Sequence, residues 1–303
     1  MSQIINTGSN PKALWPGVLK FWGMDYEKHS PEWKDLFDEK TSDKAYEEVV
    51  EMVGTGLAQV KPEGESITYD TQSQGATTRF TNVAYALGIM VTHEERKDNL
   101  YMEVLERRIP DLRFSMEQTH ETVCANVYNR AFNTSYLGAD GVTLLNTAHP
   151  TMAGNQSNRP TAGADLSETA LEDLCIQIST AQDSRGRQIK IMPMSLHVHP
   201  NDIFEATRIL ESVLQNDTAN NATNALKVLG MFPNGVKQNH YFTDSDAFFI
   251  RTNRKWSMLH FQREELLPSD DNDHDSKNLK YAAYERYTAG FSDFRGLFGS
   301  PGA

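Results

Sequence analysis

The stretch PMSLHVHPNDIFEATRIL, residues 193–210, changes its hydrophobic period halfway along. Met194, Leu196 and Val198 alternate with polar residues, which predicts a strand with one packed face. Pro200 and Asn201 end that strand. The apolar side chains that follow have helical spacing and predict an amphipathic helix: Ile203, Phe204, Ile209, Leu210, Val213 and Leu214.

Similar patterns flank this strand and helix. On the N-terminal side, Ser167 is a suitable cap for a helix with one apolar face, formed by Leu171, Leu174, Cys175 and Ile178. On the C-terminal side, Asn234-Gly235 predicts a hairpin turn. Strands are then predicted at 238–242, 247–251, 256–261 and 279–287, with the acidic loop PSDDNDHD, residues 268–275, before the last. Helices and strands without a regular βαβ rhythm favour an α+β fold.

The first half of the chain predicts a long hairpin and a long helix. Strands at 66–69 and 77–91 are joined by the polar linker 72–75. A short helical stretch from His93 is interrupted by Pro110, which suits the first turn of a second helix ending near Phe132. Residues 133–164 have little periodicity, and so long a loop is typical of a functional or subunit-contacting segment.

Residues 1 to about 50 alternate large apolar groups with Pro and Gly, so they cannot form long regular elements. Their tryptophans are Trp15, Trp22 and Trp33. Two interpretations stay open: the segment packs on its own domain, or it is an arm that docks on a neighbouring subunit.

Composition excludes several classes of protein. The 303 residues can bury a large core, and no apolar run approaches the roughly 20 residues of a membrane span. With 29 basic against 41 acidic residues, the net charge of −12 disfavours a protein that grips nucleic-acid phosphates. The two cysteines are too few for a disulfide framework or a thiolate zinc site, which fits synthesis in a reducing cytoplasm.

Metal sites are weakly indicated. His197 and His199 lie two residues apart on one strand, but no third ligand is identifiable. Asp271, Asp273 and Asp275 imitate the start of a calcium loop, yet Ser276 stands where the turn needs Gly and Ala282 where the loop needs Glu. We therefore expect no metal and no cofactor.

Catalysis is also weakly indicated. His149 in TAHP has no accompanying nucleophile motif, and a histidine that hydrogen-bonds its own loop explains it equally well. Cys124 lies among helical apolar residues, as a buried thiol does. Nucleotide-binding glycine motifs are absent from the sequence. The residues alone favour a non-catalytic protein.

Four stretches, in this order, resemble the major capsid protein of tailed bacteriophages, which has the Hong Kong 97 capsid fold, and in particular its Mu-like branch. They are VTHEERKDNLY (91–101), LLNTAHP (144–150), PMSLHVHPNDIFEATRIL (193–210) and LKVLGMFPNGVKQNHYF (226–242). The resemblance covers roughly residues 50–262 at the level of pattern.

The resemblance implies a domain plan. Residues 1–53 would be an N-terminal arm and residues 54–91 an extended loop lying across an adjacent subunit. Residues 92–163 and 246–303 would form the peripheral domain with its long spine helix, and residues 164–245 the axial domain. The candidate inter-subunit contacts are Trp15, Trp22, Trp33, Lys61, Glu63 and Arg79.

The resemblance also implies a structural function. Copies would assemble as hexamers and pentamers into an icosahedral head that encloses double-stranded DNA, bound without sequence specificity. Portal and scaffolding proteins, and in some cases a decoration protein, would be partners, and the virion would be its location after assembly in the host cytoplasm. We expect no cleaved scaffolding segment and no cross-linking through Lys61. The alternatives are an encapsulin-like compartment and a metal-dependent enzyme built on the histidines and aspartates above.

Overall fold

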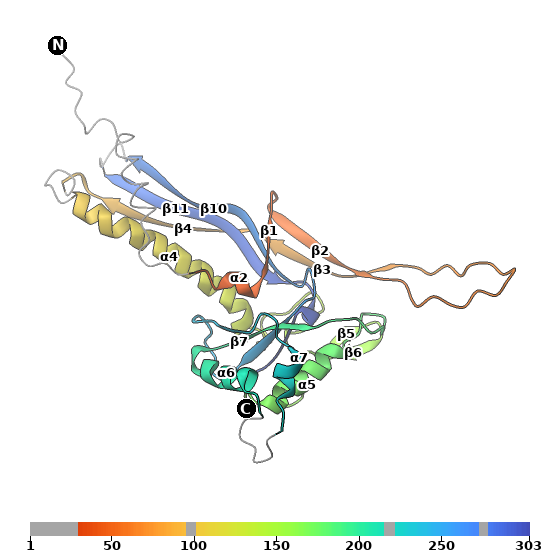
Figure 1. Cartoon of the computed structure of the whole chain (residues 1–303). Coiled ribbons are helices and arrows are strands. Elements are labelled where there is room, and N and C mark those ends of the chain that lie inside the picture. Colours follow the sequence, from red (N-terminus) through yellow and green to blue (C-terminus); the bar gives the residue numbers. More distant parts are fainter. Residues whose placement is uncertain (1–29, 95–100, 215–221, 273–277) are drawn as a thin grey trace, which may run out of the picture.

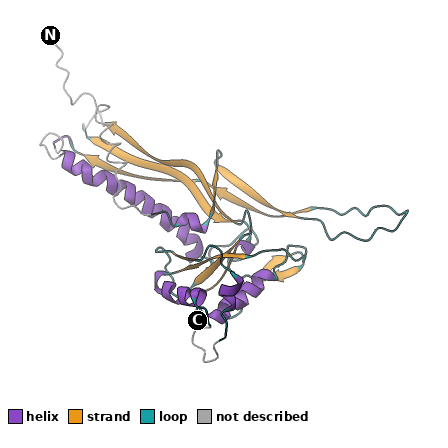
Figure 2. Ribbon diagram, in the orientation of Figure 1, coloured by secondary structure: helices purple, strands orange, loops and turns teal. Residues whose placement is uncertain are grey.

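The computed structural model describes residues 30–94, 101–214, 222–272 and 278–303. An elongated sheet with one long helix along it adjoins a second, smaller α+β layer, and a hairpin projects sideways from between them (Figures 1 and 2). Within the described residues, no helix is both long and apolar enough to cross a membrane.

The long sheet has the strand order β1-β10-β11-β4. Its strands are β1 (Asp38–Thr41), β10 (Met258–Asn272), β11 (Leu279–Phe291) and β4 (Val83–Val91). β1 is parallel to β10, and the other pairs are antiparallel. Helix α4 (Tyr101–Asn129) lies along this sheet, and the single turn α2 (Trp33–Leu36) packs beside it.

The second layer is built on the sheet β12-β9-β7-β8. Its strands are β12 (Leu297–Ser300), β9 (Phe248–Thr252), β7 (Pro193–Val198) and β8 (Val236–Gln238). The helices of this layer are α5 (Glu168–Ser179), α6 (Ile203–Glu211) and α7 (Ala225–Leu229). Short 3₁₀ turns, η3 (Pro200–Asp202) and η4 (Phe294–Gly296), precede α6 and β12. Two short strands, β5 (His149–Thr151) and β6 (Gly154–Gln156), pair within the predicted loop 133–164.

The prediction for α5 is confirmed in detail. The Ser167 side chain accepts a hydrogen bond from the Ala170 amide, which satisfies one of the free donors at the helix start. All four residues of the predicted apolar face are buried, and they pack on β7 and β9. The strand β7 is also confirmed, whereas α6 ends at Glu211 and leaves Val213 and Leu214 exposed.

The predicted break at Pro110 is wrong, because one continuous helix runs through it. Proline removes one hydrogen bond and strains the preceding turn, at a cost of about 3 kcal/mol. Burial offsets this cost, since Ile109 and Pro110 are buried and Leu112 and Met116 pack on Ala283 of β11.

The hairpin uses different strands from those predicted. β2 (Tyr46–Val53) pairs with β3 (Ser73–Thr81), and residues 54–72 form the tip, without a strand at 66–69. The predicted strand 77–91 is broken at Asn82, so β3 belongs to the hairpin and β4 to the long sheet. The buried Asn82 amide group donates to Ser42 Oγ at 3.0 Å and Lys44 O at 2.8 Å, which fixes the chain where it changes sheets.

Two further predictions are corrected. Asn234-Gly235 does not close a hairpin, because β8 runs parallel to β7. Gly235 has a φ of +67°, a conformation that favours glycine, and its carbonyl accepts from the Leu196 amide. Residues 268–272 of the acidic segment continue β10 instead of forming a loop, with Asp270 and Asp271 opposite Tyr281 and Lys280.

Candidate assembly surfaces

The hairpin tip exposes large apolar side chains. Leu57 is 82% exposed, Val60 94%, Ile67 63% and Tyr69 89%. We call these four residues the tip cluster. The tip extends away from the other described residues (Figure 1), so those residues leave these apolar side chains in water. Large exposed apolar side chains gathered on one projecting segment are typical of an interaction surface.

The base of the hairpin is held by polar contacts to the second layer. Arg185 donates from Nη1 to Asp70 Oδ2 at 2.7 Å and from Nη2 to Thr71 O at 2.6 Å. The Gly56 amide also donates to Asp70, and this hydrogen bond is the main reason that the pKa of the Asp70 carboxyl is lowered. These contacts hold the two ends of the tip, at Gly56 and at Asp70 and Thr71, whereas the tip cluster between them is exposed.

A second anchor lies at the middle of β2. Glu51 accepts a short hydrogen bond from Ser184 Oγ and lies 3.6 Å from Nη1 of the buried Arg295. Arg295 in turn donates to Asp293 and to the Gln182 carbonyl. Sequence reasoning missed these anchor residues, because Glu51 and Arg295 come from opposite ends of the chain and belong to no motif.

The predicted contact residues of the tip region have different settings. Lys61 and Glu63 are exposed on the tip. Arg79 lies on β3, where its guanidinium pairs with Glu48 Oε1 at 2.7 Å and covers the Tyr46 ring at 4.3 Å. It is therefore engaged with its own hairpin but still more than half exposed.

Trp33 corrects one expectation, whereas Trp15 and Trp22 lie outside the described residues. The Trp33 indole is buried in its own chain, with its ring centroid 4.7 Å from that of His120 on α4 and 4.2 Å from that of His260 on β10. For this residue the structure favours packing within the chain over docking on a neighbour.

Glu121 of α4 holds the start of α2. Its two carboxylate oxygens accept from the backbone amides of Glu32 and Trp33, each at 2.9 Å. Burial raises the pKa of Glu121 to about 7, although both hydrogen bonds act in the opposite direction. This carboxylate is thus the cap of α2, supplied by a helix 88 residues away.

Replacing Glu121 by alanine is expected to lower the free energy of unfolding by about 1–2 kcal/mol, because two amides at a buried helix start lose their acceptor. Glu117→Ala is the matched control: the exposed Glu117 forms an ion pair with Arg113 one helical turn away, so we expect a change within about 0.5 kcal/mol. Denaturant unfolding and amide hydrogen exchange of residues 32 and 33 measure both. Unchanged stability and unchanged exchange in Glu121→Ala would contradict the capping role.

His149 fills a structural role in its loop. The buried ring lies with Nδ1 2.6 Å from Asp140 Oδ2 and Nε2 3.0 Å from Asn158 Oδ1, and it stacks on Phe294 at 3.9 Å. The Asn158 amide group donates to three carbonyls, those of Leu144, Phe294 and Leu297. The TAHP motif is therefore part of a hydrogen-bonded loop, as the structural interpretation of the sequence predicted.

His197 of β7 and His199, which follows the strand as the N-cap of η3, do not converge on a common centre. His197 is buried with Nε2 2.8 Å from Ser195 Oγ, and burial lowers its pKa to about 3. His199 Nδ1 accepts from the Asn201 amide and caps η3. The acidic segment ends β10 in the other sheet, while Asp273 and Asp275 lie outside the described residues. The residues proposed for an enzyme site are thus used in folding or lie in separate layers.

Sequence reasoning missed a second exposed apolar surface, on α6 and α7 of the second layer. Phe204, Val228 and Leu229 are each more than two-thirds exposed. Phe204 was counted as part of the packed face of its helix, although Ala206, Ile209 and Leu210 form the buried side. Helical spacing alone cannot decide which apolar residue at the edge of a face is covered.

No protein-family model and no curated protein sequence matches this chain. Solved structures do match. The capsid of the cyanophage P-SCSP1u has a TM-score of 0.55 and 9% identity, over 91% of this chain and 89% of that chain. The capsid of Myoviridae phage XM1 has a TM-score of 0.52 and 10% identity, over 93% and 95%. A chain of Mycobacterium phage Adephagia has a TM-score of 0.51 and 12% identity, over 98% and 97%.

These likenesses define the fold. Each extends over nearly the whole of both chains, so the similarity concerns the overall fold. The chain therefore has the fold of tailed-phage capsid proteins. It is the Hong Kong 97-type fold that the four sequence stretches indicated.

Proposed function

We propose that this chain is the major capsid protein of a tailed bacteriophage. Its copies assemble as hexamers and pentamers into the icosahedral head that encloses double-stranded DNA. The observation that carries the proposal is the shared fold with phage capsids over about nine-tenths or more of both chains. The exposed tip cluster supports it, because the described residues of the chain leave these four side chains uncovered.

The fold suggests which part does what. In this proposal residues 1–29 belong to the arm, and the extended loop comprises the paired strands β2 and β3 with their tip, so it begins near residue 46 instead of 54. The long sheet and α4 form the peripheral domain. The axial domain, residues 164–245, shares its sheet with β9 and β12 beyond residue 245.

The mechanism is geometric. Burial of one Leu, Ile or Val side chain contributes about 1.5–3 kcal/mol, so a tip cluster docked on a neighbour adds a contact of moderate strength. A closed lattice repeats this contact for every subunit, and closure stabilises each copy beyond what the single chain attains. The contacts of Arg185 and Glu51 fix the hairpin in one orientation before docking, which lowers the entropic cost of docking.

The remaining parts of the proposal concern partners and chemistry. Portal and scaffolding proteins, and in some heads a decoration protein, would contact the shell. The packaged DNA would be held without sequence specificity inside a shell in which each subunit has a net charge of −12. The head would assemble in the host cytoplasm. We propose a non-catalytic role, because His149, His197 and His199 are engaged in folding contacts.

Removal of residues 1–29 tests the arm. The deletion stops before Trp33, which belongs to the core of its own chain, so we expect the melting temperature of the unassembled subunit to stay within a few degrees. We expect closed shells to fall at least tenfold, because the contacts of Trp15 and Trp22 are lost. Trp22→Ala should weaken assembly in the same direction. Sedimentation measures both, and normal shell yield from the deletion variant would refute the arm assignment.

A further inference from the structure

The inner face of α4 carries an unusual group of buried side chains. His120 and Cys124 lie one turn apart on α4, and His260 reaches them from β10. All three are buried, and their potential ligand atoms lie within 4.8 Å of one another. The two histidine Nε2 atoms are 2.9 Å apart. Imidazole nitrogens and a cysteine sulfur are the ligands that zinc prefers in proteins.

A carboxylate orients the first histidine. Glu285 Oε2 on β11 lies 3.3 Å from His120 Nδ1. A hydrogen bond donated by Nδ1–H to this oxygen leaves the lone pair of Nε2 on the side of His260. Zinc proteins commonly orient their ligating histidines with such a carboxylate. The His120 ring is further held between Tyr287, with centroids 3.9 Å apart, and Trp33.

The same place concentrates buried polar atoms without a partner among the described residues. They are His260 Nδ1, Glu285 Oε1 and Tyr287 Oη. Unpaired buried polar groups are costly, and in native proteins they commonly indicate water or an ion. A hydrated cation would supply both a positive charge and water donors at this point.

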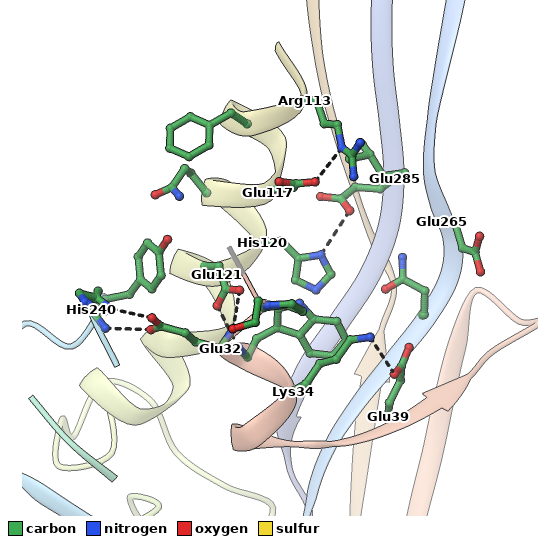
Figure 3. A pocket seen from close by; sticks show the side chains of 18 of the residues that line it. Glu32, Lys34, Glu39, Arg113, Glu117, His120, Glu121, His240, Glu265 and Glu285 are labelled. Carbon is green, nitrogen blue, oxygen red and sulfur yellow. Dashed lines mark hydrogen bonds and ion pairs between the residues drawn. The ribbon is translucent and has the colours of Figure 1, made fainter. Parts of the chain in front are cut away.

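An acidic cavity gives access to the group. It has a volume of about 960 Å³ and is lined by His120 and Glu285 (Figure 3). Cys124 and His260 are buried beside His120. Six glutamates line it, against Lys34 and Arg113 as the fixed cations. They are Glu32, Glu39, Glu117, Glu121, Glu265 and Glu285. This charge balance favours entry of a divalent cation.

We propose that His120, Cys124 and His260 bind a zinc-type divalent ion, with Glu285 as the carboxylate that orients His120 and water from the cavity in the remaining position. The ion would join α4 to β10 directly beneath Trp33, the residue that fastens α2 to this layer. This inference does not rest on the capsid proposal, and it assigns the ion a structural role.

Cobalt(II) titration of the purified full-length chain, first treated with a chelator, tests the proposal. We expect one equivalent of Co²⁺ to bind with a thiolate-to-cobalt charge-transfer band and a four-coordinate visible spectrum, and Zn²⁺ to displace it. Cys124→Ser should lose the charge-transfer band. Cys175→Ser is the matched control, because Cys175 is also buried but lies in the other layer, and it should keep the band.

Two further variants separate ligand from orienting roles. His260→Gln is expected to weaken Co²⁺ affinity by at least a hundredfold, and Glu285→Gln by about 10–100-fold. If a variant fails to fold, X-ray absorption of the zinc-loaded wild-type chain replaces it, with sulfur and imidazole ligands expected. Absence of stoichiometric metal, an unchanged band in Cys124→Ser, or a sulfur-free zinc environment would each overturn the proposal.

Discussion

Replacing the tip cluster by serine is expected to abolish closed shells while leaving the subunit folded. The substitutions are Leu57→Ser, Val60→Ser, Ile67→Ser and Tyr69→Ser. These side chains are 63–94% exposed in the single chain, so their loss removes little from its stability. In the lattice, each would lose an apolar contact of about 1.5–3 kcal/mol, repeated in every subunit.

Sedimentation and negative-stain microscopy measure the shell yield, which we expect to fall at least tenfold. Glu65→Gln is the matched control, since it changes an exposed residue of the same tip without removing apolar area. We expect near-normal assembly from this control. Shells at normal yield from the serine variant would mean that the tip makes no essential contact.

Acid is expected to destabilise the unassembled subunit through His197. The folded-state pKa of His197 is lowered to about 3, first by burial and then by the charges of Arg251 and Lys237, whereas an unfolded histidine has a pKa near 6.5. The unfolded chain therefore binds the additional proton between these values. The stability contributed by neutral His197 is complete above pH 6.5 and is lost as the pH falls toward 3, by up to about 5 kcal/mol.

Denaturant unfolding at a series of pH values from 7 to 4 measures this loss. His197→Gln should remove its own share of the pH dependence and leave that of His260, whose pKa burial also lowers to about 3, although it lowers stability at pH 7. Ser195→Ala is the control, because it removes the hydrogen-bond partner of His197 Nε2 and keeps the titrating ring. If the wild type and His197→Gln lost stability equally on acidification, His197 would not be the responsible group.

The elements that sequence alone predicted best are those set by local signals. For α5, the cap Ser167 and the apolar spacing of residues 171–178 all lie within one segment of twelve residues. For β7, the signal is the alternation of Met194, Leu196 and Val198. The resemblance to phage capsid proteins depended on the order of such segments, which the shared fold bears out.

The predictions that failed concern partners distant in sequence. Period-two alternation continues from 77 to 91, but it cannot indicate that β3 pairs with β2 and β4 with β11. Pro110 predicts a helix start from its own chemistry, whereas burial against β11 decides that the helix continues. Likewise, Trp33 lies in a Pro-rich segment that predicts an arm. Its contacts with His120 and His260, which are distant in sequence, place it in the core.

The candidate surfaces divide in the same way. Lys61 and Glu63 are candidate contacts through the resemblance, because the residues themselves predict a hairpin tip at 72–75, whereas the structure has it at 54–72. The apolar tip cluster, the Arg185 contacts and the His120–Cys124–His260 group could not be predicted from the sequence, since each depends on residues brought together by the fold. The spacing of His120 and Cys124 on one helix face is the only local signal of that group.

The most direct test of the central claim is the size of the particles that the chain forms. The chain would be expressed alone and with a candidate scaffolding protein, then examined by analytical sedimentation and electron microscopy. The proposal predicts closed icosahedral shells, or hexamer and pentamer rings where closure is incomplete. A monomer under every condition, with the fold intact, would contradict the capsid function.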